Sequence, residues 1–257
     1  MTEMARFPDL DGASVFITGG GSGIGAALTD GFLAQGAKVA FVQRSDATDF
    51  CDEMERKHGQ RPRFTACDIT DTDALKAAID GAAEAHGPIS VLVNNAANDA
   101  RHDTLDVTRD RWDELIAVNL RAYFFAAQAV IPGMQAAGGG RIVNFSSVSY
   151  MMGNAGFPVY ATANGGITAM TRVLAREFGP DRICVNAIAP GWVLTEKQKE
   201  MWATPEGLET HMARQCLPDK LSPGDMVQPV LFLASNASAV MTGQVIAVDG
   251  GVVTVAA

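Results

Sequence analysis

A glycine-rich turn near the N-terminus carries the clearest chemical signal in the chain. The apolar run at residues 15–18 leads directly into GGGSGIG at residues 19–25, and a helix-like stretch follows. Glycines permit a tight turn and let backbone N–H groups approach a pyrophosphate, which a helix N-terminus also attracts. The turn therefore predicts a dinucleotide site. The cofactor contacts that we expect from it are Gly19, Gly21, Ser22, Gly23, Ile24 and Gly25.

Further motifs follow along the chain: Asp68 in CDIT, Asn95 in NNA, Asn119 in VNL, Ser147 in IVNFSS, Tyr160 thirteen residues later, Pro190-Gly191 with Thr195, and VDGG near the end. With these motifs, spanning residues 14–251, the chain resembles the short-chain dehydrogenase/reductase family over nearly its whole length. The resemblance implies hydride transfer between a nicotinamide and a carbinol or carbonyl carbon. It also implies cofactor contacts at Asp68, Ile69, Asn95, Ala96, Ala97, Tyr160, Asn164, Pro190, Gly191, Val193 and Thr195. Ala97 replaces a family glycine, and we expect its methyl group to be tolerated.

The family roles assign the proton chemistry to three side chains. Tyr160 would be the general acid/base, Ser147 would hydrogen-bond the reacting oxygen, and Asn119 would hold a water molecule in a proton relay. The chemistry requires such a base, because a carbinol cannot lose hydride until its O–H proton is leaving.

One departure from the family pattern affects this base directly. The family has a lysine four residues after the tyrosine, where this chain has Asn164 in YATAN. Residues i and i+4 share a helix face, and the family's lysine holds the nicotinamide ribose and lowers the tyrosine pKa. An asparagine can hydrogen-bond ribose hydroxyls but carries no charge. Tyrosine has an ordinary pKa of about 10. For each pKa unit by which this value is not lowered, the ionised fraction of the base near neutral pH is up to about tenfold smaller.

Three interpretations of Asn164 remain open. The first is a natural variant that works at alkaline pH or with a replacement cation, for which Arg101 and His102 are the nearest in sequence. The second is an introduced substitution that impairs the enzyme. The third is a protein that binds the cofactor without turnover, as a sensor or assembly partner.

Cofactor choice depends on the end of the second strand-like run. An aspartate there would bind the adenosine ribose and repel a 2′-phosphate, but this chain has Gln43 followed by Arg44. An arginine forms charge-assisted hydrogen bonds with phosphate, so we favour NADP over NAD. The alternative is that Gln43 accepts a ribose hydroxyl while Arg44 stacks on adenine, which would admit NAD.

The substrate interpretation comes from a narrower resemblance within the family. Asn98-Asp99-x-Arg101-His102, the segment WATPEG from Trp202, and QCL from Gln215 look like the bacterial aldose 1-dehydrogenase group. That group oxidises the anomeric carbon of a sugar to a lactone, and a sugar is our favoured substrate. The side chains that we expect to contact it are Asn98, Ser147, Ser149, Asn154 and Trp192. The alternative is an apolar ketone or alcohol, for which Met151, Met152 and Phe157 would line the pocket.

These residues must be positioned by alternating strands and helices. Strand-like runs at residues 15–18, 39–42, 64–67, 91–94, 142–145, 183–188 and 245–248 alternate with helical patterns at 24–33, 74–86, 112–136 and 165–178. Continuous apolar strands separated by helices predict a doubly wound parallel sheet of about seven strands, with helices on both faces. No linker or repeat divides the chain, so we expect an α/β Rossmann-like domain over residues 1–257.

Two further features concern the surface of this domain. Residues 191–221 contain no strand and two weakly amphipathic pieces, and they follow the sixth strand on the ligand side of such a sheet. A lid over the site is our preferred interpretation, and an ordinary surface excursion is the alternative. The helices at 112–136 and 165–178 look like those through which the family dimerises, and the resemblance implies a homotetramer.

Composition limits the remaining possibilities. The formal net charge is −9, the wrong sign for a nucleic-acid binder or an anionic membrane surface. We expect a cytoplasmic protein, because the N-terminus lacks a secretory pattern. Cys51, Cys67, Cys184 and Cys216 are scattered and predict core thiols, and the four histidines show no zinc-binding spacing, so no metal is expected.

Overall fold

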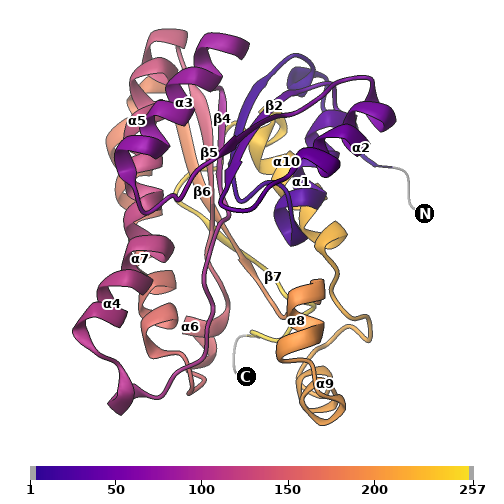
Figure 1. Cartoon of the computed structure of the whole chain (residues 1–257), viewed down its shortest axis with the longest axis vertical. Helices are drawn as coiled ribbons and strands as arrows, with labels where there is room; N and C mark the ends of the chain where they lie inside the picture. The colour runs from indigo at the N-terminus through magenta and orange to yellow at the C-terminus, as the bar shows by residue number, and fades with distance from the viewer. Residues whose placement is uncertain (1–3, 255–257) are drawn as a thin grey trace.

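A single parallel sheet organises the molecule. The computed structural model describes residues 4–254, and its seven strands follow the order β3-β2-β1-β4-β5-β6-β7 (Figure 1). Every strand pairing is parallel, which confirms the predicted sheet. The strands are β1 (Ser14–Thr18), β2 (Lys38–Gln43), β3 (Arg63–Ala66), β4 (Val91–Asn94), β5 (Gly140–Phe145), β6 (Ile183–Pro190) and β7 (Val245–Val248).

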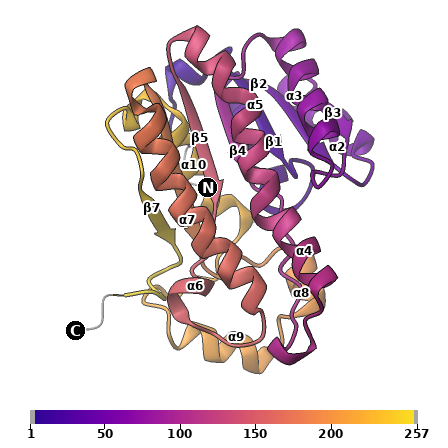
Figure 2. The ribbon, with the colours of Figure 1, turned by 90° about the vertical axis from the view of Figure 1, so that its left-hand side faces the viewer.

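Helices cover both faces of the sheet. The α-helices are α1 (Gly23–Ala34), α2 (Thr48–His58), α3 (Thr72–His86), α4 (Arg109–Ile116), α5 (Ala122–Ala137), α6 (Ser149–Met152), α7 (Pro158–Phe178), α8 (Glu196–Met201), α9 (Pro205–Met212) and α10 (Val227–Ala234). α1, α2 and α10 pack on one face, and α3, α5 and α7 pack on the other (Figures 1 and 2). The structure is therefore the three-layer arrangement that the strand pattern predicts.

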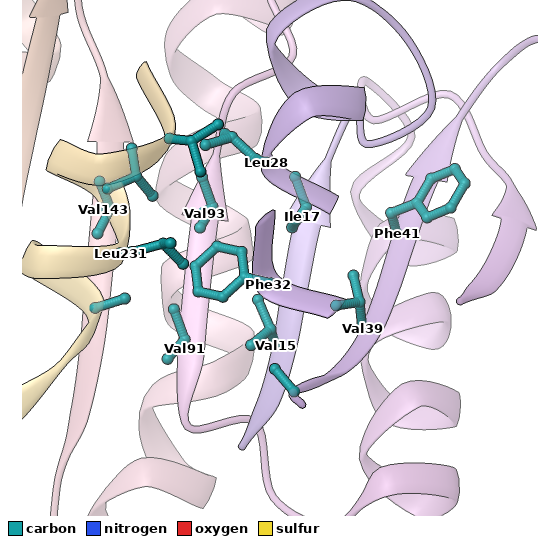
Figure 3. Packing of buried hydrophobic residues seen from close by; sticks show 14 of the residues in the cluster. Val15, Ile17, Leu28, Phe32, Val39, Phe41, Val91, Val93, Val143 and Leu231 are labelled. Atoms are coloured by element: carbon teal, nitrogen blue, oxygen red, sulfur yellow. The ribbon is translucent and has the colours of Figure 1, made fainter. Parts of the chain in front are cut away.

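The period of two along each strand divides the core between these faces. Val15 and Ile17 join the cluster under α1 and α10, whereas Phe16 between them joins the cluster under α3 and α5. Figure 3 shows the first cluster, in which Phe32 of α1 and Leu231 of α10 cover the central strands. This packing leaves the carboxyl ends of the strands free to carry polar loops.

Several helices differ from the sequence prediction. The predicted helix at 112–136 begins at Arg109 and is interrupted by a π-helical segment, Ala117–Arg121. The helix predicted at 165–178 begins earlier, at Pro158, because Gly165-Gly166 breaks the apolar period. α2 and α10 were not predicted: α2 is largely polar and has only three apolar residues, Phe50, Cys51 and Met54, whereas α10 is apolar almost throughout and so shows no clear helical period.

The four cysteines differ in their burial. Cys51, Cys67 and Cys184 are buried, but Cys216 is exposed, so the prediction of a core thiol was wrong for Cys216. It lies in the turn after α9, where its Sγ donates to the Gly251 carbonyl at 3.2 Å. The continuous helical stretch Arg109–Ala137 is long and apolar enough to cross a membrane, yet half of its most apolar window is buried, and its α5 part packs on α3, β4 and β5. This packing is that of a core helix.

Candidate active site

A large cavity lies at the carboxyl ends of the strands, where open parallel sheets bind ligands. Its volume is about 1770 Å³, above the range of roughly 300–1,000 Å³ typical of a drug-sized ligand. The loops after β1, β4, β5 and β6 contribute lining residues, and so does the segment at 191–221, which we call the lid segment. The cavity therefore has room for a dinucleotide together with a second molecule.

The glycine-rich turn forms part of the cavity wall in a conformation that requires glycine. Gly19 and Gly23 have φ of 73° and 52°, which L side chains adopt only rarely. A Cβ on Gly25 would lie 1.8 Å from the Gly19 carbonyl oxygen, so α1 packs directly on the end of β1. Gly21 donates its N–H to Gln43 Oε1 at 3.0 Å. This backbone cradle at a helix N-terminus fits a pyrophosphate.

The loop after β4 is fastened to the same turn. The N–H groups of Asn95 and Ala96 donate to Thr18 Oγ1 at 2.9 and 3.2 Å, and Asn95 Nδ2 donates to the Thr18 and Gly19 carbonyls. Asn95 and Ala96 also line the cavity. Sequence patterns assign no role to the Thr18 hydroxyl. In the structure it fastens the loop after β4 to the glycine-rich turn.

The adenosine end of the expected site carries charge. The Asp68 carboxylate accepts hydrogen bonds from the Thr70 N–H and hydroxyl at 2.9 and 2.8 Å. The Thr70 N–H is the main cause that holds the pKa of Asp68 below its ordinary value, and Arg44 acts in the same direction. Gln43 Nε2 donates to the Ser45 carbonyl at 3.0 Å. Because both ends of the Gln43 amide are engaged within the protein, Arg44 is the better placed group to receive a phosphate.

Ser147 and Tyr160 meet in the same cavity. Ser147 follows β5, and Tyr160 lies in the first turn of α7. The Tyr160 ring is half-buried, and its centroid lies 6.0 Å from that of the Phe157 ring. Burial raises the pKa of the Tyr160 phenol above its ordinary value, and the Asp99 carboxylate adds to this rise. The Ser147 hydroxyl and the Asn164 amide act on this pKa in the opposite direction. The pair can therefore bind and deprotonate a hydroxyl, with a base that ionises at alkaline pH.

Asn164 and Asn119 do not line the cavity. Asn164 is 2% exposed, and its Nδ2 donates to the Tyr160 backbone carbonyl at 2.9 Å, one turn back along α7. Asn119, in the π-helical segment, accepts from the Asn98 N–H at 2.8 Å and donates to the Asn98 carbonyl at 3.0 Å. Asn119 therefore positions the loop after β4, and the water relay assigned to it stays a prediction.

The expected substrate residues gather around one region of the cavity wall. Asn98, Ser149, Asn154 and Trp192 all line the cavity. The Ser149 hydroxyl is buried without a hydrogen-bond partner, whereas the indole N–H of Trp192 donates to Gln198 Oε1 at 2.9 Å. The indole N–H of Trp192 is therefore engaged within the protein, and the substrate contact predicted for Trp192 stays a prediction. Met152 and Phe157 also line the cavity, but Met151 does not.

Of the two cations considered as replacements for the family lysine, only Arg101 lines the cavity. Its guanidinium lies 5.5 Å from the Phe157 ring centroid and 5.1 Å from that of Trp202. His102 is held by backbone groups instead, since Nδ1 contacts the Ala100 carbonyl at 2.9 Å and Nε2 accepts from the Val159 N–H at 3.4 Å. Neither cation is among the groups that set the pKa of Tyr160.

The structure therefore brings most of the predicted site residues to one cavity. The predicted residues that do not line it are Gly21, Gly25, Asn119 and Asn164. Asp99, Lys197 and Gln198 line it as well and were not predicted as site residues. Asp99 lies inside a motif that the sequence analysis singled out, but no sequence signal connects it with the lid segment. Among the described residues, no group of three His, Cys, Asp or Glu side chains could hold a metal ion.

The chain is similar to known proteins in both sequence and fold. The family model described as "Enoyl-(Acyl carrier protein) reductase" matches residues 19–253. A Rhizobium meliloti (strain 1021) protein named "Probable galactose dehydrogenase" is 47% identical over 250 residues, 96% of this chain and 98% of that protein. The D-xylose 1-dehydrogenase of Caulobacter vibrioides (strain NA1000 / CB15N) is 46% identical over 248 residues, with 96% and 98% covered. A solved blue fluorescent protein from a metagenomic library, in complex with NADPH, matches with a TM-score of 0.86 and 34% identity, covering 95% of this chain and 99% of that one.

Proposed function

This chain belongs to the short-chain dehydrogenase/reductase family, and from that premise we propose that it oxidises the anomeric carbon of a cyclic aldose to a lactone, with a nicotinamide dinucleotide as hydride acceptor. The observation that carries the proposal is that Ser147 and Tyr160 line the same cavity as the glycine-rich turn. The names of the two relatives, a galactose and a xylose dehydrogenase, support a sugar as the substrate.

The chain's own contribution is to bind, orient and move a proton. When bound, the nicotinamide supplies the carbon that accepts hydride. The Ser147 hydroxyl holds the reacting sugar oxygen, and the Tyr160 phenolate takes its proton as the C–H bond breaks. Backbone N–H groups of the glycine-rich turn, together with the N-terminus of α1, bind the pyrophosphate. The order of these roles follows from the chemistry, since hydride leaves readily only from a developing alkoxide.

A polyhydroxylated substrate suits the polar part of the wall. The Ser149 hydroxyl has no partner in the described part of the chain, and Asn98 accepts from the Ala100 N–H through Oδ1 while its Nδ2 makes no such bond. A site with unpaired polar groups favours ligands whose hydroxyls satisfy them. Met152 and Phe157 keep an apolar alcohol as the second candidate substrate.

Initial rates of nicotinamide reduction test the proposal. The panel contains D-galactose, D-xylose, L-arabinose and cyclohexanol, each with NAD and with NADP, near neutral pH and near the ordinary tyrosine pKa of about 10. We expect turnover on at least one aldose, faster at the higher pH and abolished by Tyr160→Phe with cofactor binding retained. Turnover on cyclohexanol alone would replace the sugar with an apolar alcohol. Cofactor binding without turnover on any substrate would favour the non-catalytic alternative.

For the cofactor we propose NADP in preference to NAD. Arg44 lines the cavity beside Asp68, and no carboxylate stands at the end of β2, where Gln43 binds its own loop instead. A guanidinium in this place can pair with a 2′-phosphate. The NADPH-bound relative supports the same class of cofactor.

For the assembly we propose a homotetramer. Phe124 on α5 is 43% exposed and Val173 on α7 is 61% exposed, on the two helices that the family resemblance implicates. Large apolar side chains exposed on neighbouring helices suit an isologous contact. Light scattering during size-exclusion chromatography tests this assignment, and a monomer at micromolar concentration would reject it.

A further inference from the structure

The helix that carries Tyr160 begins without a capping side chain of its own. α7 follows Phe157, whose side chain offers no hydrogen-bond acceptor, and its first residue is Pro158, which has no N–H. Val159 therefore has the first backbone N–H of the helix, and the residue is buried. The first N–H groups of a helix have no partner within it, so this N–H needs an acceptor from elsewhere in the chain.

His102, in the loop after β4, supplies this acceptor. Its Nε2 accepts from the Val159 N–H at 3.4 Å, and its Nδ1 lies 2.9 Å from the Ala100 carbonyl oxygen. Because a carbonyl oxygen can only accept, the proton is on Nδ1 and the lone pair is on Nε2. The two contacts thus require the same neutral tautomer, since an imidazolium has no lone pair to offer to Val159.

The same loop contacts the start of α7 at two further points. The His102 N–H donates to the Gly156 carbonyl at 2.8 Å, and the Arg101 guanidinium lies 5.5 Å from the centroid of the Phe157 ring. The centroid of the Tyr160 ring lies 6.0 Å from that of the same phenylalanine. The loop therefore contacts both the backbone that enters α7 and the aromatic ring beside the base.

Hydrogen bonds connect this cap with the π-helical segment. The Ala100 N–H donates to Asn98 Oδ1 at 3.1 Å, and the Asn98 backbone exchanges two hydrogen bonds with the Asn119 amide, at 2.8 and 3.0 Å. Since the Ala100 carbonyl accepts from His102, the loop is bonded at one end to Asn119 and at the other to the N-terminus of α7. It is thus a fixed support against which His102 can hold the helix.

We propose that His102 is a positioning residue that caps α7 and thereby holds the Tyr160 phenol in its place in the cavity. The inference rests on the proposed function only in taking Tyr160 as the base. His102 acts through the backbone of α7 and does not line the cavity. Its effect on the rate follows from orientation, because a misplacement of about 1 Å at a catalytic group can lower a rate about a hundredfold.

Three substitutions separate the cap from the rest of the imidazole. His102→Gln keeps an amide oxygen near the position of Nε2, which can accept from Val159. His102→Asn is one methylene shorter, so its amide reaches only the Ala100 carbonyl, near the position of Nδ1. His102→Leu removes both contacts. His58→Leu is the matched control, because His58 contacts Asp30 of α1 at 2.6 Å and does not line the cavity.

The first readout is the environment of the Tyr160 ring, measured without substrate. The chain has three tyrosines, so fluorine NMR of protein labelled with 3-fluorotyrosine resolves them, and Tyr160→Phe identifies the Tyr160 signal. His102→Asn and His102→Leu should shift or broaden this signal, whereas His102→Gln and His58→Leu should leave it in place. An unmoved signal in all four variants, or equal shifts in His102→Gln and His102→Asn, would overturn the proposal.

Initial rates on an aldose that the unaltered protein oxidises provide the second readout. We expect kcat to fall about 10- to 100-fold in His102→Asn and His102→Leu, and to stay within about threefold in His102→Gln. His58→Leu should leave kcat unchanged, and the KM for the cofactor should stay constant throughout. A change confined to KM would contradict the positioning role. Circular dichroism verifies that each variant folds. If the unaltered protein oxidises no sugar, the proposed function fails, and the fluorine signal still decides on His102.

Discussion

The side-chain amide of Asn164 donates to the backbone carbonyl of Tyr160 at 2.9 Å, so the residue in the family's lysine position is directed along its own helix. It is 2% exposed and outside the cavity lining. The Ser147 and Asn164 side chains are the groups that favour the ionised form of Tyr160. Near neutral pH, a smaller fraction of Tyr160 is therefore ionised than in a family member with lysine. Each phenolate that does form is a stronger base.

The first prediction concerns the pH dependence of the unaltered protein. The pKa of Tyr160 is raised above its ordinary value, chiefly by burial. The active form is the phenolate, so the rising limb of kcat against pH moves upward, and we expect kcat to increase about tenfold per pH unit from neutrality to beyond pH of about 10. Steady-state rates under saturating substrate and cofactor measure this limb. A plateau reached near neutrality would contradict it.

Asn164→Lys should move that limb downward. An ammonium beside the phenol favours the phenolate, and a fall of two pKa units would give about a hundredfold more ionised base near neutral pH. Asn164→Met is the control, because it lengthens the side chain without adding charge. Since the Asn164 amide itself favours the phenolate, its loss should move the limb slightly upward, opposite to the effect of the lysine. If both variants fold and show the same profile as the unaltered protein, Asn164 is not the cause of alkaline operation.

The fold was largely predictable because its signals are local. Residues 91–94 and 245–248 are strands with the predicted bounds, since a short apolar run between polar loops needs no partner to be recognised. α10 was missed because its residues are apolar on almost every side, which removes the helical period. The π-helical segment around Asn119 was missed because it continues the apolar pattern of its neighbours.

The site was predictable where a motif is contiguous and unpredictable where two segments meet. The glycine-rich turn, Asn95 and Tyr160 line one cavity as expected. The contact of Asp99 with Lys197 joins residues far apart in sequence, through a segment with weak periodicity. The direction of the Asn164 amide depends on how a buried side chain satisfies its donors, which residue type alone does not specify.

Gly25→Ala should impair folding and cofactor binding together. Its Cβ would lie 1.8 Å from the Gly19 carbonyl oxygen, so α1 would have to move away from β1, at a cost of about 1–3 kcal/mol. Gly165→Ala on α7 is the matched control, because no atom lies within 4 Å of its Cβ, and helix propensity should stabilise it by about 0.8–1 kcal/mol. Urea unfolding and calorimetric titration with NADP measure both effects. Unchanged NADP binding in Gly25→Ala would contradict the close packing.

Tyr123→Phe should stabilise the protein and extend its alkaline range. The Tyr123 hydroxyl is buried and has no hydrogen-bond partner within residues 4–254, and removing such a group relieves about 1 kcal/mol. Burial raises the pKa of Tyr123 well above its ordinary value. Its contribution to stability is therefore complete below the unfolded pKa of about 10 and falls by about 1.4 kcal/mol per pH unit above it. Urea unfolding at several pH values measures both effects. Loss of stability at neutral pH would mean that the hydroxyl has a partner, such as a buried water molecule.

Arg44→Ala should reverse the cofactor preference. A charge-assisted hydrogen bond to a 2′-phosphate contributes about 1.5–3 kcal/mol, so kcat/KM for NADP should fall about 10- to 150-fold while that for NAD changes little. Arg56→Ala on α2 provides the control, because its side chain bonds only the Asp52 carbonyl at 3.2 Å. The ratio of kcat/KM for the two cofactors is the measurement, since it cancels any common effect on catalysis. If Arg44→Ala lowers both values equally, Arg44 contacts a part that the cofactors share, and the preference for NADP has another origin.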